Sequence, residues 1–170
     1  MKAFCFLVLV FIAGFLRAPV TPGAAAQPSA DAGAEKAISV VLDDWHSAAS
    51  AADEARYFGH FAEGAVFLGT DATERWTVEE FRLYAHPYFA KGKAWSFRAV
   101  SRHVAFSKDG AVAWFDEALD TPNLGPARGS GVLVRSAVGG EWKIAHYDLS
   151  VPIPNALMKE IKERIAAGGR

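Results

Sequence analysis

Cysteine is almost absent from this chain, since Cys5 is the only one among the 170 residues. One cysteine excludes an intrachain disulfide, and Cys5 lies in a leader segment that we expect to be cleaved. The mature chain would then have no thiol nucleophile and no thiolate ligand for a metal. Its stability must come from packing, which a sequence with 51% hydrophobic residues can supply in one compact domain.

A hydrophobic run long enough to cross a membrane is also missing. The apolar run "AFCFLVLVFIAGFL" is shorter than the roughly 20 residues that span a bilayer. Lys2 precedes this run and the small residues "GAAAQ" follow it, so residues 1–26 are predicted to be a secretory signal peptide. Because Arg17 has no arginine beside it, we expect the general secretory route, a periplasmic or secreted location, and no stable membrane insertion after cleavage. A signal retained as an anchor is the alternative.

An excess of positive charge is missing as well. Removing Lys2 and Arg17 from the 18 basic residues leaves 16 against 19 acidic ones, a net charge of −3. No basic stripe remains that could neutralise a phosphate backbone, so nucleic acid is not an expected partner. The sequence has no glycine-rich phosphate loop, and its histidines show no repeated ligand spacing. We therefore expect no cofactor and no metal.

The periodicity of hydrophobic residues predicts helices first and strands afterwards. Residues 27–35 contain proline and glycine and are expected to form a flexible linker. Thr77 with Glu80 forms a capping box, and Trp76 with Phe81 a hydrophobic staple, so a helix is predicted to begin there. The predicted helices cover residues 36–52, 54–61 and 77–90, the predicted strands cover 64–69, 95–106, 111–119, 128–136 and 142–151, and a C-terminal helix and tail occupy 156–170.

Three stretches carry a family resemblance: "FAEGAVFLGTD", "WTVEEF", and "RGSGVLV" followed by "EWKIAHYDLSVPIPN". In this order of elements they resemble the nuclear transport factor 2-like superfamily, specifically its SnoaL-like branch, over about residues 36–155. The resemblance implies a cone-shaped α+β barrel, in which a curved antiparallel sheet wraps around N-terminal helices and encloses a cavity. It also implies relatives such as ketosteroid isomerases, polyketide cyclases and dehydratases, and a homodimer formed through the sheet.

Strand alternation predicts which side chains face that cavity. In the last strand His146 and Asp148 share a face with apolar residues, so both are predicted to point inward. The face of the preceding strand that contains Arg128 is taken as interior by the same rule. Both faces of strand 111–119 are apolar, so either Asp116 or Glu117 could point inward. We expect the inward acid to pair with Arg128, because an unpaired buried charge is costly.

Large rings provide the expected apolar wall of the cavity. Such walls with a few convergent polar groups are typical of small-molecule sites and grip flat hydrophobic ligands. The alternative is that most of these rings are ordinary core packing. The predicted pocket consists of Trp45, Phe61, Phe67, Trp76, Tyr84, Tyr88 and Trp95, with Arg128 and Asp148 as polar members.

Three residues are candidates for catalysis. Asp71, in "GTD", is either a turn residue that accepts a backbone N–H or a desolvated base, and the resemblance implies an aspartate base near this connection. Glu117 is the second candidate base. His146 is either a proton shuttle or a core histidine.

Three functions remain open at this point. The first is an exported protein that binds a small, largely apolar molecule. The second is a proton-transfer enzyme similar to ketosteroid isomerases or polyketide cyclases, and the third is a non-catalytic homodimeric association module.

Overall fold

The computed structural model describes residues 28–135 and 140–168. The predicted signal peptide, residues 1–26, lies outside them, as does Ser136 at the end of a predicted strand. The elements are α1 (Pro28–Ser50), α2 (Glu54–Gly59), β1 (Phe61–Leu68), β2 (Arg75–Thr77), α3 (Val78–Ala90), β3 (Arg98–Phe106), β4 (Val112–Thr121), β5 (Gly125–Val134), β6 (Lys143–Ser150), the 3-10 helix η1 (Asn155–Leu157) and α4 (Met158–Ala166).

The strands form one six-stranded sheet in the order β2-β1-β6-β5-β4-β3. β1 and β6 are parallel and every other pairing is antiparallel. Register shifts interrupt three of the pairings, which bends the strands as bulges do. The predicted α+β fold with a curved sheet is confirmed, although β2 and β3 are free edges and the sheet does not close into a barrel.

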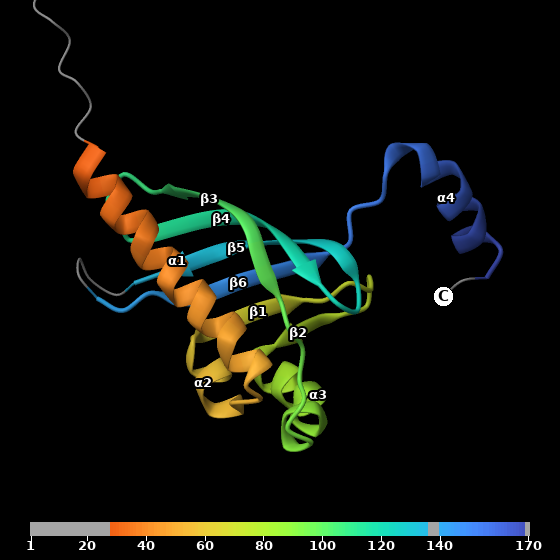
Figure 1. The fold of residues 1–170 in the computed structure, drawn as a ribbon, viewed down its shortest axis with the longest axis horizontal. Helices are drawn as coiled ribbons and strands as arrows, with labels where there is room; N and C mark the ends of the chain where they lie inside the picture. Colours follow the sequence, from red (N-terminus) through yellow and green to blue (C-terminus); the bar gives the residue numbers. More distant parts are fainter. Residues whose placement is uncertain (1–27, 136–139, 169–170) are drawn as a thin grey trace, which may run out of the picture.

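Figure 1 shows α1 crossing one face of the sheet, with α2 and α3 beyond the β1–β2 end. α1 packs there because its apolar residues recur three or four positions apart and so form one stripe. The stripe is fully or almost fully buried and consists of Ile38, Leu42, Trp45, Ala48 and Ala49. The ring of Trp45 lies 5.0 Å from that of Tyr57 in α2 and 4.6 Å from that of Tyr147 in β6. The centre of the core therefore joins α1, α2 and the sheet.

The predicted start of α3 is confirmed in detail. Thr77 Oγ1 accepts a hydrogen bond from the backbone N–H of Glu80 at 3.2 Å, and Glu80 Oε2 accepts one from the backbone N–H of Thr77 at 2.8 Å. The rings of Trp76 and Phe81 lie 5.6 Å apart and nearly parallel. This capping box and staple fix the start of α3 next to β2.

The two ends of the described chain compare differently with the predictions. Residues 28–35, expected to be a flexible linker, form the first turns of α1. The predicted C-terminal helix is present as α4; no residue of α4 is buried, and it lies apart from the sheet in Figure 1. None of the helices in residues 28–135 and 140–168 is both long enough and apolar enough to cross a membrane.

Candidate functional site

A cavity of about 240 Å³ opens between α3, the β1–β2 loop, the start of β3 and the β4–β5 turn. Five of the predicted pocket rings line it, together with two rings, Phe81 and Phe97, that were not predicted as pocket residues. The aromatic lining residues are Phe67, Trp76, Phe81, Tyr84, Tyr88, Trp95 and Phe97. Two of the predicted rings, Trp45 and Phe61, are not in the lining and belong to the core. The aromatic cavity, as we call it below, therefore lies at one end of the sheet.

Several of these rings are stacked in parallel. Phe67 and Phe81 have centroids 4.0 Å apart with 14° between their planes. Trp76 stacks on Tyr84 at 4.8 Å with 22° between the planes. Offset stacking of this kind is favourable for aromatic pairs, and a flat ligand ring can extend the same stack. The wall therefore suits planar molecules.

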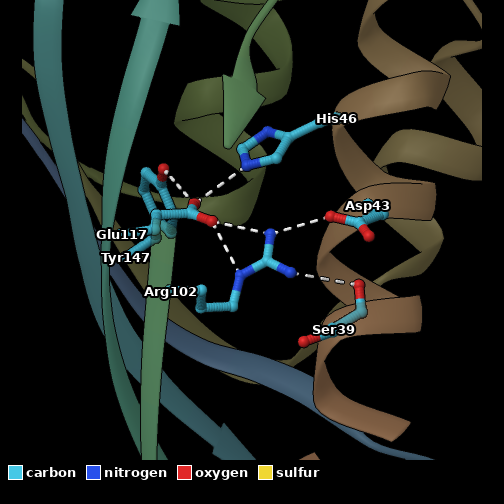
Figure 2. A network of polar contacts seen from close by, with 6 residues as sticks. All are labelled: Ser39, Asp43, His46, Arg102, Glu117 and Tyr147. Carbon is cyan, nitrogen blue, oxygen red and sulfur yellow. Dashed lines mark hydrogen bonds and ion pairs between the residues drawn. The ribbon is translucent and has the colours of Figure 1, made fainter. Parts of the chain in front are cut away.

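A second polar feature lies deeper, between α1 and the sheet (Figure 2). Glu117 in β4 is 1% exposed, and both of its carboxylate oxygens accept hydrogen bonds. Oε2 accepts from Arg102 Nε at 2.9 Å and Nη2 at 2.7 Å, and Oε1 accepts from the Tyr147 hydroxyl at 3.1 Å. His46 Nε2 lies 2.8 Å from Oε1. Since the ionised carboxylate can only accept, Nε2 carries the proton and donates it.

Arg102 connects these hydrogen bonds to α1. Its Nη2 donates to Asp43 Oδ1 at 2.9 Å and its Nη1 to the backbone carbonyl of Ser39 at 3.3 Å. The Arg102 side chain is 8% exposed, so its charge is compensated by carboxylates rather than by water. We call Glu117, Arg102, His46 and Tyr147 the buried network; Asp43, at its outer end, is exposed.

The buried network keeps Glu117 ionised. Burial alone raises the pKa of its carboxyl, but the hydrogen bond from His46 and the charge and hydrogen bonds of Arg102 outweigh that effect, so the pKa lies below its ordinary value. Burial also raises the pKa of the Tyr147 hydroxyl, and the Glu117 charge raises it further. A carboxylate with this many donors is a weak proton acceptor. Glu117 does not line the aromatic cavity, so we assign it a structural role, in which its charge holds the side chains that donate to it.

The partner of the inward acid differs from the prediction. Glu117 is the inward residue and Asp116 is exposed on the other face of β4. Arg128, however, is exposed and aligns with Ala118, on the same outer face as Asp116. The expected Glu117–Arg128 pair is therefore wrong, and Arg102 takes that position because it lies directly opposite Glu117 in β3.

The inward orientation predicted for His146 and Asp148 is also wrong. The pairing of β5 and β6 shifts between Val132 and Leu133, where Ala145 is an extra residue on β6. One extra residue inverts the alternation beyond it. The buried residues after the shift are Tyr147 and Leu149, so the two predicted residues lie on the outer face of the sheet.

Asp71 lies in an exposed turn. Its Oδ1 accepts hydrogen bonds from the backbone N–H of Thr73 at 2.8 Å and from the Thr73 hydroxyl at 2.6 Å. These bonds lower the pKa of the Asp71 carboxyl, which is the opposite of what a desolvated base requires. The geometry is that of the turn interpretation, and Asp71 does not join Glu117 or His146.

His46 and Arg102 were not predicted as site residues. His46 lies on the buried face of α1, where its spacing matches core residues, and Arg102 lies in β3, within a stretch predicted only as a strand. Only their pairing with Glu117, 71 and 15 residues away, shows their role. In the described part of the chain, no group of three or more His, Cys, Asp or Glu side chains is arranged to hold a metal ion.

The fold has clear relatives among solved structures. An NTF2-like protein of unknown function from Pseudomonas putida is 15% identical, with a TM-score of 0.60 over 73% of this chain and 90% of that chain. A candidate dehydratase of the NTF2-like family from Streptomyces avermitilis is 12% identical, with a TM-score of 0.58 over 72% of this chain and 99% of that one. A candidate ketosteroid isomerase from Parabacteroides distasonis is 16% identical, with a TM-score of 0.54 over 69% and 86%. At these identities the likeness establishes the fold alone.

The curved open sheet with helices on one face is similar to the fold of nuclear transport factor 2-like proteins. More narrowly, the chain belongs to the SnoaL-like domain family, because the model of that family matches residues 38–154. A search of curated proteins found no match. The predicted superfamily and branch are thus confirmed.

Replacing Arg102 tests the buried network. Arg102→Met is expected to lower the free energy of unfolding by about 3–5 kcal/mol at neutral pH, because it leaves an ionised Glu117 without its cation. Urea unfolding followed by tryptophan fluorescence measures the loss. Arg98→Met is the matched control, since Arg98 lies on the same strand in an exposed pair with Asp120 and should cost at most about 1 kcal/mol. Equal losses in the two variants would contradict the anchoring role.

The same network predicts a pH dependence. Because the pKa of Glu117 is lowered on folding, its charge stabilises the fold above the ordinary value of 4.5, and this contribution disappears as the pH falls through the folded-state pKa. The difference in unfolding free energy between wild type and Glu117→Gln should therefore shrink as the pH falls below 4.5. Urea titrations at neutral pH and at about pH 3 provide the comparison. A difference that stays constant would show that Glu117 is not held ionised.

Proposed function

We propose that this chain is an exported protein that binds a small, flat, largely apolar molecule in the aromatic cavity. The observation that carries the proposal is the cavity of about 240 Å³ with stacked rings in its wall. Small-molecule sites span roughly 300–1,000 Å³, so this one suits a compact ligand. Export rests on the sequence of residues 1–26 alone.

The cavity is supported by elements that do not depend on a ligand. Phe81 is buried against Phe67 and is fixed by the cap of α3, while Trp76 lies in β2. A site whose walls are already packed loses little side-chain freedom on binding. By contrast, Tyr84 and Tyr88 are about half exposed, at 46% and 45%, and can gain burial from a ligand.

A two-ring probe tests whether the cavity accepts a ligand. We expect 2-naphthol to bind, to quench tryptophan fluorescence and to raise the melting temperature. Tyr88→Ala should weaken its binding about tenfold, because one aromatic contact contributes about 0.5–1.5 kcal/mol beyond area burial. Leu83→Ala, on the same helix but 77% exposed and outside the lining, is the matched control. A probe that fails to bind, or binds Tyr88→Ala as well as wild type, would rule out this site.

Proton transfer is the second candidate function, and one observation favours it. The Nδ1 atom of His46 is buried and has no hydrogen-bond partner within the described residues, while Nε2 is held by Glu117. A histidine fixed in this way presents a free lone pair, and the carboxylate stabilises the imidazolium that forms when it takes a proton. His46 lines a second cavity of about 330 Å³ between α1 and β3, and Phe97 lines both cavities.

The corresponding reaction breaks a C–H bond next to a carbonyl. The proton goes to His46 Nδ1 and the electron pair moves toward the carbonyl oxygen, so that the substrate becomes an enolate. We expect the protein to speed deuterium incorporation next to the carbonyl of 1-tetralone in D₂O, as followed by proton NMR. His46→Gln should abolish that increase, while His103→Gln, an exposed residue of β3, should leave it unchanged. No protein-dependent exchange in the wild type would eliminate this function.

We propose in addition that two copies associate through the outer face of the sheet. Trp114 is 49% exposed there, Val132 lies beside it in register, and His146 lies beside Val132 on the next strand. Trp114→Lys is expected to convert dimer to monomer in sedimentation velocity, because it places a charge where apolar area would be buried. Leu83→Lys on α3 serves as the control. A wild type that sediments as a monomer at high concentration would contradict the dimer.

A further inference from the structure

The wall of the aromatic cavity carries charge of one sign only, which is negative. Among its lining residues Glu74 is the only acidic one, and none is a lysine, arginine or histidine. Its other polar groups are neutral: the hydroxyls of Thr70, Thr121 and two tyrosines, and the amide of Asn123. A ligand with a negative charge would therefore find no cation in the wall.

The Glu74 carboxylate is held in place by its own loop. Gly69 N–H donates to the backbone carbonyl of Glu74 at 2.8 Å, and Glu74 Oε2 accepts from the backbone N–H of Asp71 at 3.0 Å. A Cβ atom on residue 69 would overlap the Glu74 side chain, so Gly69 leaves the space in which the carboxylate lies. The negative charge thus has a defined position at the rim.

No basic side chain neutralises this charge within the described residues, since Glu74 forms no ion pair there. Arg98 follows the lining residue Phe97, but its Nη2 lies 2.7 Å from Asp120 Oδ2 on the exposed side of the sheet. Burial raises the pKa of the Tyr84 hydroxyl, the neighbouring Tyr88 raises it further, and the Glu74 charge adds a smaller contribution in the same direction. The tyrosine therefore stays a neutral phenol.

The rings add to the same preference. The face of an aromatic ring carries partial negative charge, so it attracts a cation and repels an anion. Trp76 and Trp95, the residue type with the strongest such attraction, line the cavity together with Tyr84 and Tyr88. A cation that contacts the face of one of these rings is therefore attracted by the ring as well as by the Glu74 carboxylate.

We propose that the ligand of the aromatic cavity is a flat organic cation, that is, a planar ring system with a protonated or alkylated nitrogen placed near Glu74. This inference rests on the proposed binding function and specifies the class of ligand. The planar part extends the ring stack, and the cationic nitrogen replaces the water that otherwise solvates the Glu74 carboxylate.

Three two-ring probes that differ in charge test the inference. They are 1-methylquinolinium, 2-naphthol and 2-naphthoate, with dissociation constants measured by tryptophan fluorescence and calorimetry at low ionic strength. We expect the cation to bind about tenfold more tightly than 2-naphthol, since cation–π and ion-pair attraction each contribute on the order of 1 kcal/mol. The anion should bind most weakly.

Glu74→Gln removes the charge and keeps the shape and an acceptor oxygen. This variant should lose about tenfold in affinity for 1-methylquinolinium and bind 2-naphthol as the wild type does. Glu79→Gln, an exposed residue in the first turn of α3 and outside the lining, should change neither. Unchanged 2-naphthol binding shows that the loop is still folded.

The outcomes separate this inference from the function on which it rests. If none of the three probes binds, the cavity does not take ligands and both proposals fail. If all three bind equally, or 2-naphthoate binds most tightly, the binding function stands and the preference for a cation is refuted. A cation preference that survives in Glu74→Gln would refute the role of that carboxylate.

Discussion

The arrangement of this fold depends on one buried carboxylate. Glu117 is 1% exposed and ionised, so the structure must supply donors from several elements at once: Arg102 from β3, Tyr147 from β6 and His46 from α1. Leaving such a charge unpaired costs several kcal/mol. The bonds of His46 to Glu117 and of Arg102 to Ser39 and Asp43 therefore favour the observed placement of α1 on the sheet. Gly129 belongs to the same constraint, because a Cβ there would overlap the Tyr147 hydroxyl and lie 2.9 Å from Glu117 Oε1.

With α1 fixed in this way, some aromatic residues fill the core and others line the cavity. Where α1 lies on the sheet, rings such as Trp45 and Tyr57 pack on one another and fill the space. Where α1 ends and the chain turns into α2 and α3, the curved sheet has no long helix to cover it. The rings there stack along the wall instead of across the space, as Phe67 and Phe81 do, and a cavity remains. Core and cavity are thus two parts of one continuous aromatic cluster.

Local signals in the sequence predicted local structure well, and failed where a single residue changed the geometry. The cap of α3 and the order of the elements were predictable because each depends on residues a few positions apart. The face of the sheet on which His146 lies could not be predicted. Strand alternation assumes an uninterrupted strand, and the register shift at Ala145 inverts the alternation. Arg102 and His46 could not be paired with Glu117 from spacing, since only the register of β3 with β4 and the position of α1 bring them together.

The two acids next to aromatic surfaces differ in how their charge is compensated. Glu117 receives the full charge of Arg102 and further donors, so little of its field extends beyond the buried network. Glu74 accepts a backbone N–H but has no cation beside it in the described chain. Since water is the only other source of compensation for Glu74, a ligand that displaces this water must provide positive charge or lose affinity. The buried network therefore stabilises the fold, whereas the uncompensated carboxylate determines which ligands the cavity can accept.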